Sequence, residues 1–185
     1  MTNGQRSRIA LETESSIPNG QRLRIALRHA VSIALLPGMV AVAGPAWLLA
    51  QAGDTRWADG SATQVLARVG GLMLISAGAG LFAWCVALFA SVGRGTLAPW
   101  DPTRQLVTVG PYRLSRNPMI AGVALALAGQ ALYHGSRWLT TWAVAFMAIN
   151  HIYFLLVEEP SLRRRFGEAY CDYATRVPRW LRWPV

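Results

Sequence analysis

Four long apolar stretches without a single charged side chain constrain this chain more than any other feature. They run from Ala30 to Ala50, from Val69 to Gly93, from Asn117 to Ser136 and from Trp138 to Val157. A helix needs about 20 apolar residues to cross the hydrocarbon core of a bilayer. Buried helices of soluble proteins rarely run this long without a charge. The sequence therefore predicts an all-α integral membrane bundle of about four transmembrane helices.

The composition agrees with a membrane environment. Of the 185 residues, 53% are hydrophobic and only 15% are charged, whereas a soluble domain usually carries about a quarter charged residues. The net charge is +9, and all 18 basic residues are arginines that flank the apolar stretches. This placement fits loops at an anionic membrane surface better than a nucleic-acid-binding stripe. We expect no nucleic-acid partner.

The first apolar stretch contains two prolines, Pro37 and Pro45. Prolines kink a spanning helix but are tolerated in it, so we expect one kinked helix. A broken first helix, giving five helical segments, is the alternative. Ala41–Ala43 resembles a signal-peptide cleavage site, but the region before the stretch is long and the apolar run continues past it. We therefore expect an uncleaved span.

The distribution of arginines predicts the orientation of the bundle. Fifteen of the 18 arginines lie in the N-terminal tail, the second loop and the C-terminal tail, which share one side if there are four spans. By the positive-inside rule this side is cytoplasmic, and we expect the membrane to be a bacterial inner membrane. The third loop is only a residue or two around Ser136 and Arg137. The last two spans must then form a tight antiparallel hairpin.

The chain divides into three expected regions. Residues 1–28 form a basic, disordered cytoplasmic tail in which Asn3–Leu11 recurs almost unchanged at Asn19–Leu27; a basic amphipathic segment on the membrane is the alternative. Residues 29–96 hold the first two spans. Residues 97–185 hold the last two spans and a C-terminal helix.

The C-terminal helix is predicted from about Pro160 to Thr175. A proline suits the first turn of a helix, and the apolar residues that follow recur at helical spacing, which predicts an amphipathic helix at the membrane interface. Those residues are Leu162, Phe166, Tyr170, Tyr173 and Val177. We expect Trp180 and Trp183 to anchor it at the interface.

Residues able to do chemistry gather at the predicted cytoplasmic end. They lie in the loop 100–116, at the start of the third span and at Glu158–Glu159. The hairpin should make Asn117 and Glu158 neighbours. However, Asn117 before Pro118 is also an ordinary helix start, and a glutamate pair is often a solvated helix end.

The remaining candidates give weaker indications. Cys85 and Cys171 lie far apart, so we expect both to be reduced and neither to bind a metal. His134 and His151 lie in spans without a second ligand at metal spacing. We expect packing or hydrogen-bonding roles for both, and no metal cofactor.

Two motifs flank the hairpin of the last two spans. The first is Leu106–Met119, which reads Leu-Val-Thr-Val-Gly-Pro-Tyr-Arg-Leu-Ser-Arg-Asn-Pro-Met. The second is Glu158–Tyr170, Glu-Glu-Pro-Ser-Leu-Arg-Arg-Arg-Phe-Gly-Glu-Ala-Tyr, with Val177-Pro178-Arg179 after it. Together they resemble the isoprenylcysteine carboxyl methyltransferase and phospholipid methyltransferase superfamily. The resemblance covers about residues 97–180.

The resemblance implies an integral membrane methyltransferase that uses S-adenosylmethionine and acts on a lipophilic acceptor, which is a carboxylate, an amine or a thiol. A carboxylate and aromatic faces suit the cationic groups of this cofactor. The positions that the resemblance assigns to the cofactor are Arg104, Gln105, Leu106, Val107, Tyr112, Asn117, Pro118, Met119, Ile120 and Glu158. No catalytic residue is assigned, and Glu159 is a candidate base for an amine or thiol acceptor.

Three positions depart from the family pattern. Asn117 stands where the family often has histidine, and Ile120 where it often has tyrosine. Phe154 stands where eukaryotic prenylcysteine enzymes have a substrate-linked arginine, which counts against a prenylcysteine carboxylate. A non-catalytic scaffold or lipid-binding member is the alternative function. A small transporter is disfavoured because the spans lack intramembrane charges.

The oligomeric state stays open in the sequence. Small residues allow two spanning helices to approach closely. Gly70, Gly71, Gly78 and Gly80 place such residues in the second span.

Overall fold

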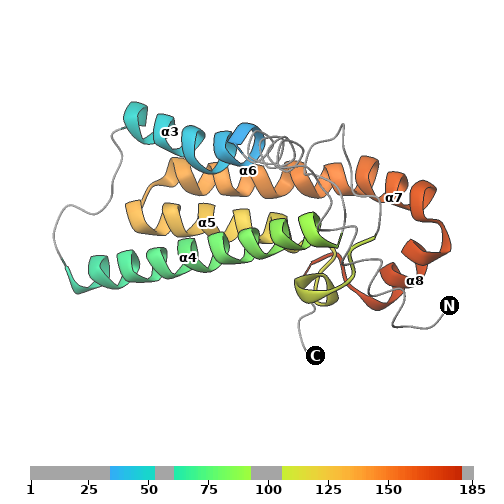
Figure 1. Ribbon diagram of the computed structural model, residues 1–185. Helices are drawn as coiled ribbons and strands as arrows, with labels where there is room; N and C mark the ends of the chain where they lie inside the picture. Colours follow the sequence, from blue (N-terminus) through green and yellow to red (C-terminus); the bar gives the residue numbers. More distant parts are fainter. Residues whose placement is uncertain (1–33, 53–60, 93–105, 181–185) are drawn as a thin grey trace, which may run out of the picture.

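The computed structural model describes residues 34–52, 61–92 and 106–180 of the chain. These residues are helical, without a strand among them, and the long helices lie side by side in antiparallel order (Figure 1). The expected N-terminal tail with its repeat and the expected anchor Trp183 lie outside the described residues.

Two helices are long and apolar enough to cross a membrane, judged by length and composition. They are α4 (Ala62–Ser91) and the continuous helix Arg137–Phe166, each of 30 residues. The helix α5 (Pro118–His134) is apolar but shorter. The structure thus agrees with an all-α fold that holds spanning helices.

The first helix runs without interruption through both of its prolines. A π-helix, η1 (Ala34–Ala43), contains Pro37 and passes directly into α3 (Gly44–Ala52). Pro45 has no N–H, so one carbonyl in the preceding turn of the helix lacks its usual backbone donor. Two side chains of the hairpin donate to carbonyls of that turn, as described next. We find one continuous helix where a broken one was the alternative.

The hairpin supplies side-chain donors to two carbonyls of the first helix. Gln130 Nε2 donates to the carbonyl of Ala41 at 2.9 Å, and Trp142 Nε1 donates to that of Val40 at 3.0 Å. In an apolar environment an unpaired carbonyl is costly. These two bonds therefore tie the first helix to both arms of the hairpin.

The helix α4 begins about two turns before the apolar stretch that predicts it. Ser61 caps it, accepting a hydrogen bond from the Gln64 N–H at 3.4 Å. The first turns therefore include Arg68, whose guanidinium lies over the Tyr133 ring at 5.9 Å.

Glycines bring α4 and α5 together, as the small residues of the second span allow. A methyl group added at Gly71 would lie 2.7 Å from the Gly129 carbonyl oxygen. One added at Gly78 would overlap the Gly122 carbonyl oxygen, whereas one at Gly80 would meet nothing within 4 Å. The close packing of α4 on α5 thus depends on backbone-to-backbone contact at two levels.

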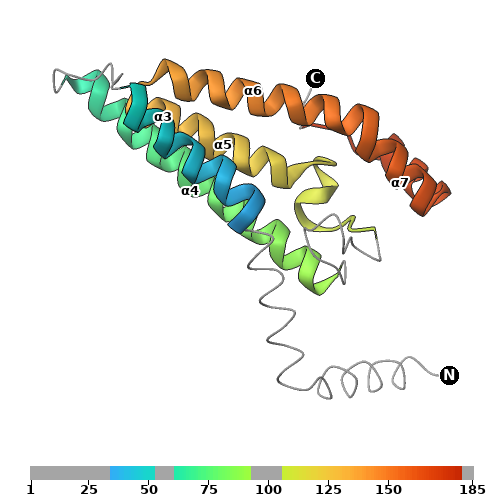
Figure 2. The ribbon, with the colours of Figure 1, turned by 90° about the horizontal axis from the view of Figure 1, so that it is seen from above.

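The predicted tight hairpin is confirmed. Gly135 ends α5 in the left-handed region at φ 61°, and Ser136 caps α6 (Arg137–Tyr153) by accepting from the Leu139 N–H. The helix then continues through a π-helical turn, η3 (Phe154–Glu158), into α7 (Glu159–Phe166) without a break (Figure 2).

The prediction of one C-terminal helix over 160–175 is wrong. The helix α7 prolongs the last span, and α8 (Glu168–Arg176) turns back at Gly167 (Figure 1). Gly167 has φ 54° and ψ −130°, a conformation that other residues rarely adopt. The predicted apolar residues still meet: Tyr170, Tyr173 and Val177 form a buried cluster bordered by Leu106, Leu162 and Phe166.

Candidate functional site

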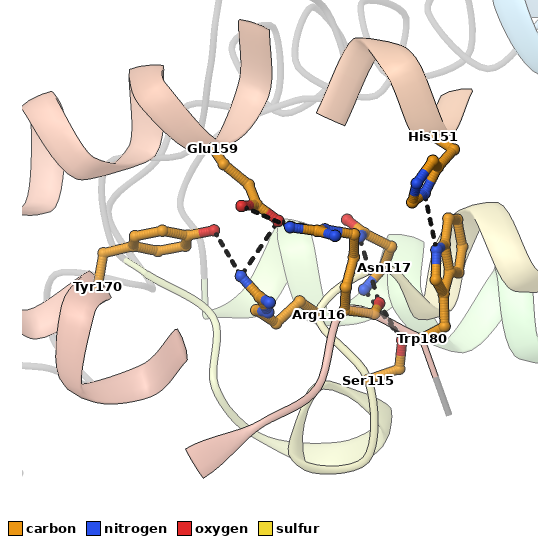
Figure 3. Close-up of polar contacts among 8 residues, drawn as sticks. Ser115, Arg116, Asn117, His151, Glu159, Tyr170 and Trp180 are labelled. Carbon is orange, nitrogen blue, oxygen red and sulfur yellow. Dashed lines mark hydrogen bonds and ion pairs between the residues drawn. The ribbon is translucent and has the colours of Figure 1, made fainter. Parts of the chain in front are cut away.

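Three separate parts of the chain meet at one end of the bundle. They are the segment 106–119 that leads into α5, the end of the long helix around Glu158 and Glu159, and the segment 170–180. Figure 3 shows the polar side chains that they bring together. The arginines of these segments lie at this end, whereas Arg68 and Arg137 belong to the opposite end.

Tyr112 is a buried residue of the segment 106–119. Gly110 at φ 60° starts the short 3-10 helix η2 (Gly110–Arg113), which buries the Tyr112 ring against Phe89 at 5.6 Å and in a cluster with Cys85. The Tyr112 carbonyl accepts from the Tyr173 hydroxyl at 2.7 Å.

Burial is the main cause that raises the pKa of Tyr112 far above its usual value. Cys85, Tyr173 and the charge of Glu158 raise it further. The hydroxyl therefore stays protonated at physiological pH and cannot serve as a base. Burial likewise raises the pKa of Tyr173.

Glu159 is held by two arginines. Its carboxylate receives Arg179 Nε at 2.6 Å and Arg179 Nη2 at 3.0 Å, a bidentate pair, and Arg116 Nη1 at 3.1 Å. The hydrogen bond to Glu159 is the main cause that raises the pKa of Arg179. Arg116 Nη1 also donates to the Tyr170 hydroxyl at 3.4 Å. Since both arginines already occupy this carboxylate, Glu159 is a poor general base.

Glu158 differs sharply from its neighbour. It is half-buried and makes no hydrogen bond or ion pair with any residue that the structure describes. Its charge acts on Tyr112 and Tyr170, so the carboxyl lies near both phenols. Of the two glutamates, Glu158 is the one available to a ligand.

Asn117 does not act as the ordinary helix cap that its position suggests. Its side chain makes no capping bond to α5. Instead, Nδ2 donates to the carbonyl of Arg179 at 3.3 Å, and the backbone N–H donates to Ser115 Oγ at 3.1 Å. The amide oxygen receives no hydrogen bond from the described residues and faces the site as an open acceptor.

Asn117 and Glu158 were expected to be neighbours, and the direct contact is made by the residues beside them. Arg116 and Glu159 form the direct contact, and no hydrogen bond joins Asn117 to Glu158. The hairpin does bring the two segments together, as the sequence predicts.

The other predicted cofactor positions are distributed around this region. Val107 and Pro118 are buried, and Leu106, Met119 and Ile120 are half-buried. Met119 packs against the Tyr112 cluster, whereas Leu106 packs against Tyr170 and its neighbours. Arg104 and Gln105 lie outside the described residues.

The sequence assigned no site role to Ser115, Arg116, Tyr170 and Arg179, although the structure places all four in this network. Each lies within or next to the motifs Leu106–Met119, Glu158–Tyr170 and Val177–Arg179. Their position in these motifs was the available signal. Buried ion pairing of this kind has no periodic pattern in a sequence, so contacts between these residues could not be predicted.

Trp180 contacts two aromatic side chains of the long helix, His151 and Phe154. Its indole Nε1 donates to His151 Nδ1 at 3.2 Å, and its ring packs on Phe154 at 5.7 Å. His151 thus has the hydrogen-bonding role expected of it. Phe154 is only 3% exposed, so the position that departs from the prenylcysteine enzymes is filled by a packed aromatic.

Both cysteines are free thiols, with Cys85 buried and Cys171 exposed. Within residues 34–52, 61–92 and 106–180, no three His, Cys, Asp or Glu side chains gather as a metal site. The polar chemistry of this region therefore comes from carboxylates, guanidinium groups, an amide and phenols.

Comparison with known protein families matches residues 66–169 to phospholipid methyltransferase. The match extends from α4 to the beginning of α8, and includes Tyr112, Asn117, Glu158 and Glu159. No curated protein and no solved structure matched the chain.

Proposed function

The chain belongs to the phospholipid methyltransferase family, and from this premise we propose that it is an integral membrane enzyme that transfers a methyl group from S-adenosylmethionine to a lipophilic acceptor. The observation that carries the proposal is the unequal state of two adjacent glutamates. Glu159 is neutralised by Arg116 and Arg179, whereas Glu158 has no partner among the described residues.

The groups left open in the site fit the cofactor. S-adenosylmethionine carries a sulfonium cation, an ammonium group and a carboxylate. Glu158 and the ring of Tyr112 suit the cationic groups. Arg116 Nε is a buried donor without a hydrogen-bond partner among the described residues, and a buried donor of this kind is costly unless it is paired. It suits the carboxylate of the cofactor.

When bound, the cofactor supplies a methyl group on an already activated sulfur. The protein then contributes mainly positioning and the exclusion of water. Asn117 offers its amide oxygen as a hydrogen-bond acceptor. A carboxylate acceptor needs no base, while an amine acceptor that arrives protonated must lose its proton before it attacks.

The proposal includes four membrane crossings with both termini in the cytoplasm. The helix α5 has 17 residues, or about 26 Å of helix, which is slightly short of a hydrocarbon core of about 30 Å. It packs between α4 and the continuous helix Arg137–Phe166, the two longer candidates, and the first helix is bonded to it through Gln130. A water-soluble cofactor then reaches the arginine-rich end from the cytoplasm.

Calorimetry of the detergent-solubilised protein with S-adenosylmethionine tests the proposal. We expect the wild type to bind and Glu158→Gln to lose at least about tenfold in affinity, because the carboxylate is a charge-assisted partner. Glu168→Gln is the matched control, since Glu168 is exposed in the first turn of α8, and its affinity should be unchanged. No binding by the wild type, or equal loss in both variants, would contradict the site.

Transfer of labelled methyl groups into a total membrane lipid extract tests the reaction itself. A labelled lipid supports the enzyme and identifies its acceptor. Cofactor binding without a labelled lipid favours the non-catalytic alternative.

A further inference from the structure

The segment Pro178–Trp180 follows the last helix and returns into the site. The Arg116 N–H donates to the Pro178 carbonyl at 2.9 Å. The carbonyl of Arg179 accepts from Ser115 Oγ at 3.0 Å and from Asn117 Nδ2 at 3.3 Å. The backbone of this segment therefore bonds to three consecutive residues at the start of α5.

The side chains of the same segment bond to the other wall of the site. Arg179 forms its bidentate pair with Glu159, while Trp180 bonds to His151 and packs on Phe154. The segment thus bridges the start of α5 and the end of the long helix. It has no helical hydrogen bonds of its own after Val177, so these contacts are what hold it in place.

This bridge decides which polar atoms remain open. Because the Arg179 carbonyl takes the Nδ2 group of Asn117, the amide oxygen is the free end. Because Arg179 and Arg116 both pair with Glu159, Glu158 is the carboxyl of the two that has no ion pair with a described residue. Both consequences depend on where residue 179 lies, and the residues matched to the family end at 169.

We propose that Arg179 is a positioning residue of the cofactor site, which it completes from outside the matched part of the chain. Its side chain contacts Glu159 and leaves the cofactor to Asn117 and Glu158. Through the ion pair it fixes its own carbonyl against Asn117. This inference rests on the proposed function, and it adds a residue through which the site is ordered.

Cofactor affinity in a double-mutant cycle tests the inference. We expect Arg179→Met to weaken the binding of S-adenosylmethionine by about tenfold or more, since it removes charge-assisted hydrogen bonds that order the segment. Arg179→Lys keeps the charge but loses the bidentate geometry. Its affinity for S-adenosylmethionine should lie between those of the wild type and Arg179→Met. Arg176→Met is the matched control. Among the residues that the structure describes, the Arg176 guanidinium bonds only to the carbonyl of Asp172, so the affinity should stay within about twofold.

The coupling with Asn117 separates positioning from a general loss of stability. If Arg179 acts through Asn117, Arg179→Met should add little in an Asn117→Ala background, whereas two independent effects would add. Additive losses, unchanged affinity in Arg179→Met, or an equal loss in Arg176→Met would overturn the inference while leaving the proposed function standing. Absence of binding by the wild type overturns both. If Arg179→Met does not fold, Arg179→Lys with an unchanged melting temperature carries the same comparison.

Discussion

At the scale of single residues, the site depends on a difference between two adjacent glutamates in their ion-pair partners. The sequence presents Glu158 and Glu159 as equivalent helix-end carboxylates. The structure gives one of them two arginines and leaves the other open. The difference comes from helix geometry, because consecutive residues point about 100° apart on a helix. Glu159 therefore faces Arg116 and Arg179, while Glu158 lies toward Tyr112.

Asn117 marks the limit of sequence reasoning at this scale. The pair Asn117-Pro118 predicts a helix start, and α5 does begin at Pro118. The amide oxygen does not accept the expected capping bond, and the side chain is held instead by the bond from Nδ2 to the Arg179 carbonyl, 62 residues later. Local preference predicted the backbone correctly, and a long-range partner decided the side chain.

The buried phenol of Tyr112 predicts a pH effect on stability. Its folded-state pKa lies above the ordinary value of about 10. The neutral form is therefore favoured by the fold, and its contribution is complete below pH about 10 and lost as the pH rises through the folded-state value. We expect Tyr112→Phe to show a smaller fall in melting temperature between pH about 9 and about 11 than the wild type.

Tyr153→Phe is the control for this measurement, because Tyr153 is 49% exposed. Its melting temperature should follow the wild-type pH dependence. An unchanged slope in Tyr112→Phe would mean that Tyr112 is not the group that resists ionisation.

At the scale of elements, backbone contact between α4 and α5 sets the separation of the helices that carry the site. Gly78 of α4 meets the carbonyl of Gly122, and its added methyl group would also lie 2.7 Å from the Ala126 nitrogen. These neighbours are backbone atoms, so a change of side-chain rotamer cannot relieve the overlap. We expect Gly78→Ala to lower the free energy of unfolding by about 1–3 kcal/mol, measured by thermal or denaturant unfolding in detergent.

Gly80→Ala in the same helix is the matched control. A methyl group there meets nothing within 4 Å, and alanine is the better helix former by about 1 kcal/mol. Gly80→Ala should therefore be neutral or slightly stabilising. A loss of stability in Gly80→Ala equal to that in Gly78→Ala would show that close packing is not the cause.

The elements also separate what the sequence predicts from what it leaves undetermined. The hairpin was predictable because two uncharged stretches leave only a residue or two between them. The break between α7 and α8 was missed because the apolar residues keep helical spacing across Gly167. A glycine inside such a pattern is compatible with a continuous helix and with a turn, and the packing of Tyr170 and Tyr173 on the segment 106–112 selects the turn.

At the scale of the whole molecule, chemical labelling of the native cysteines can test the orientation of the protein in the membrane. Cys171 is exposed at the arginine-rich end, whereas Cys85 is completely buried. If that end is cytoplasmic, a membrane-impermeant maleimide should label Cys171 in inverted vesicles and fail to label it in intact cells.

Cys171→Ser should abolish the labelling in inverted vesicles, since Cys85 is inaccessible. Labelling of Cys171 in intact cells would reverse the orientation that the arginine distribution predicts.

The bonds from Gln130 and Trp142 to the first helix have a consequence for biogenesis. The carbonyls of Val40 and Ala41, in the turn before Pro45, accept from residues 102 and 89 positions later in the chain. If this helix crosses the membrane, as we propose, it is inserted before the hairpin that carries these donors. Until the hairpin is inserted, the two carbonyls lack these bonds. In that case, the stable packing of this helix in the membrane depends on the insertion of the hairpin.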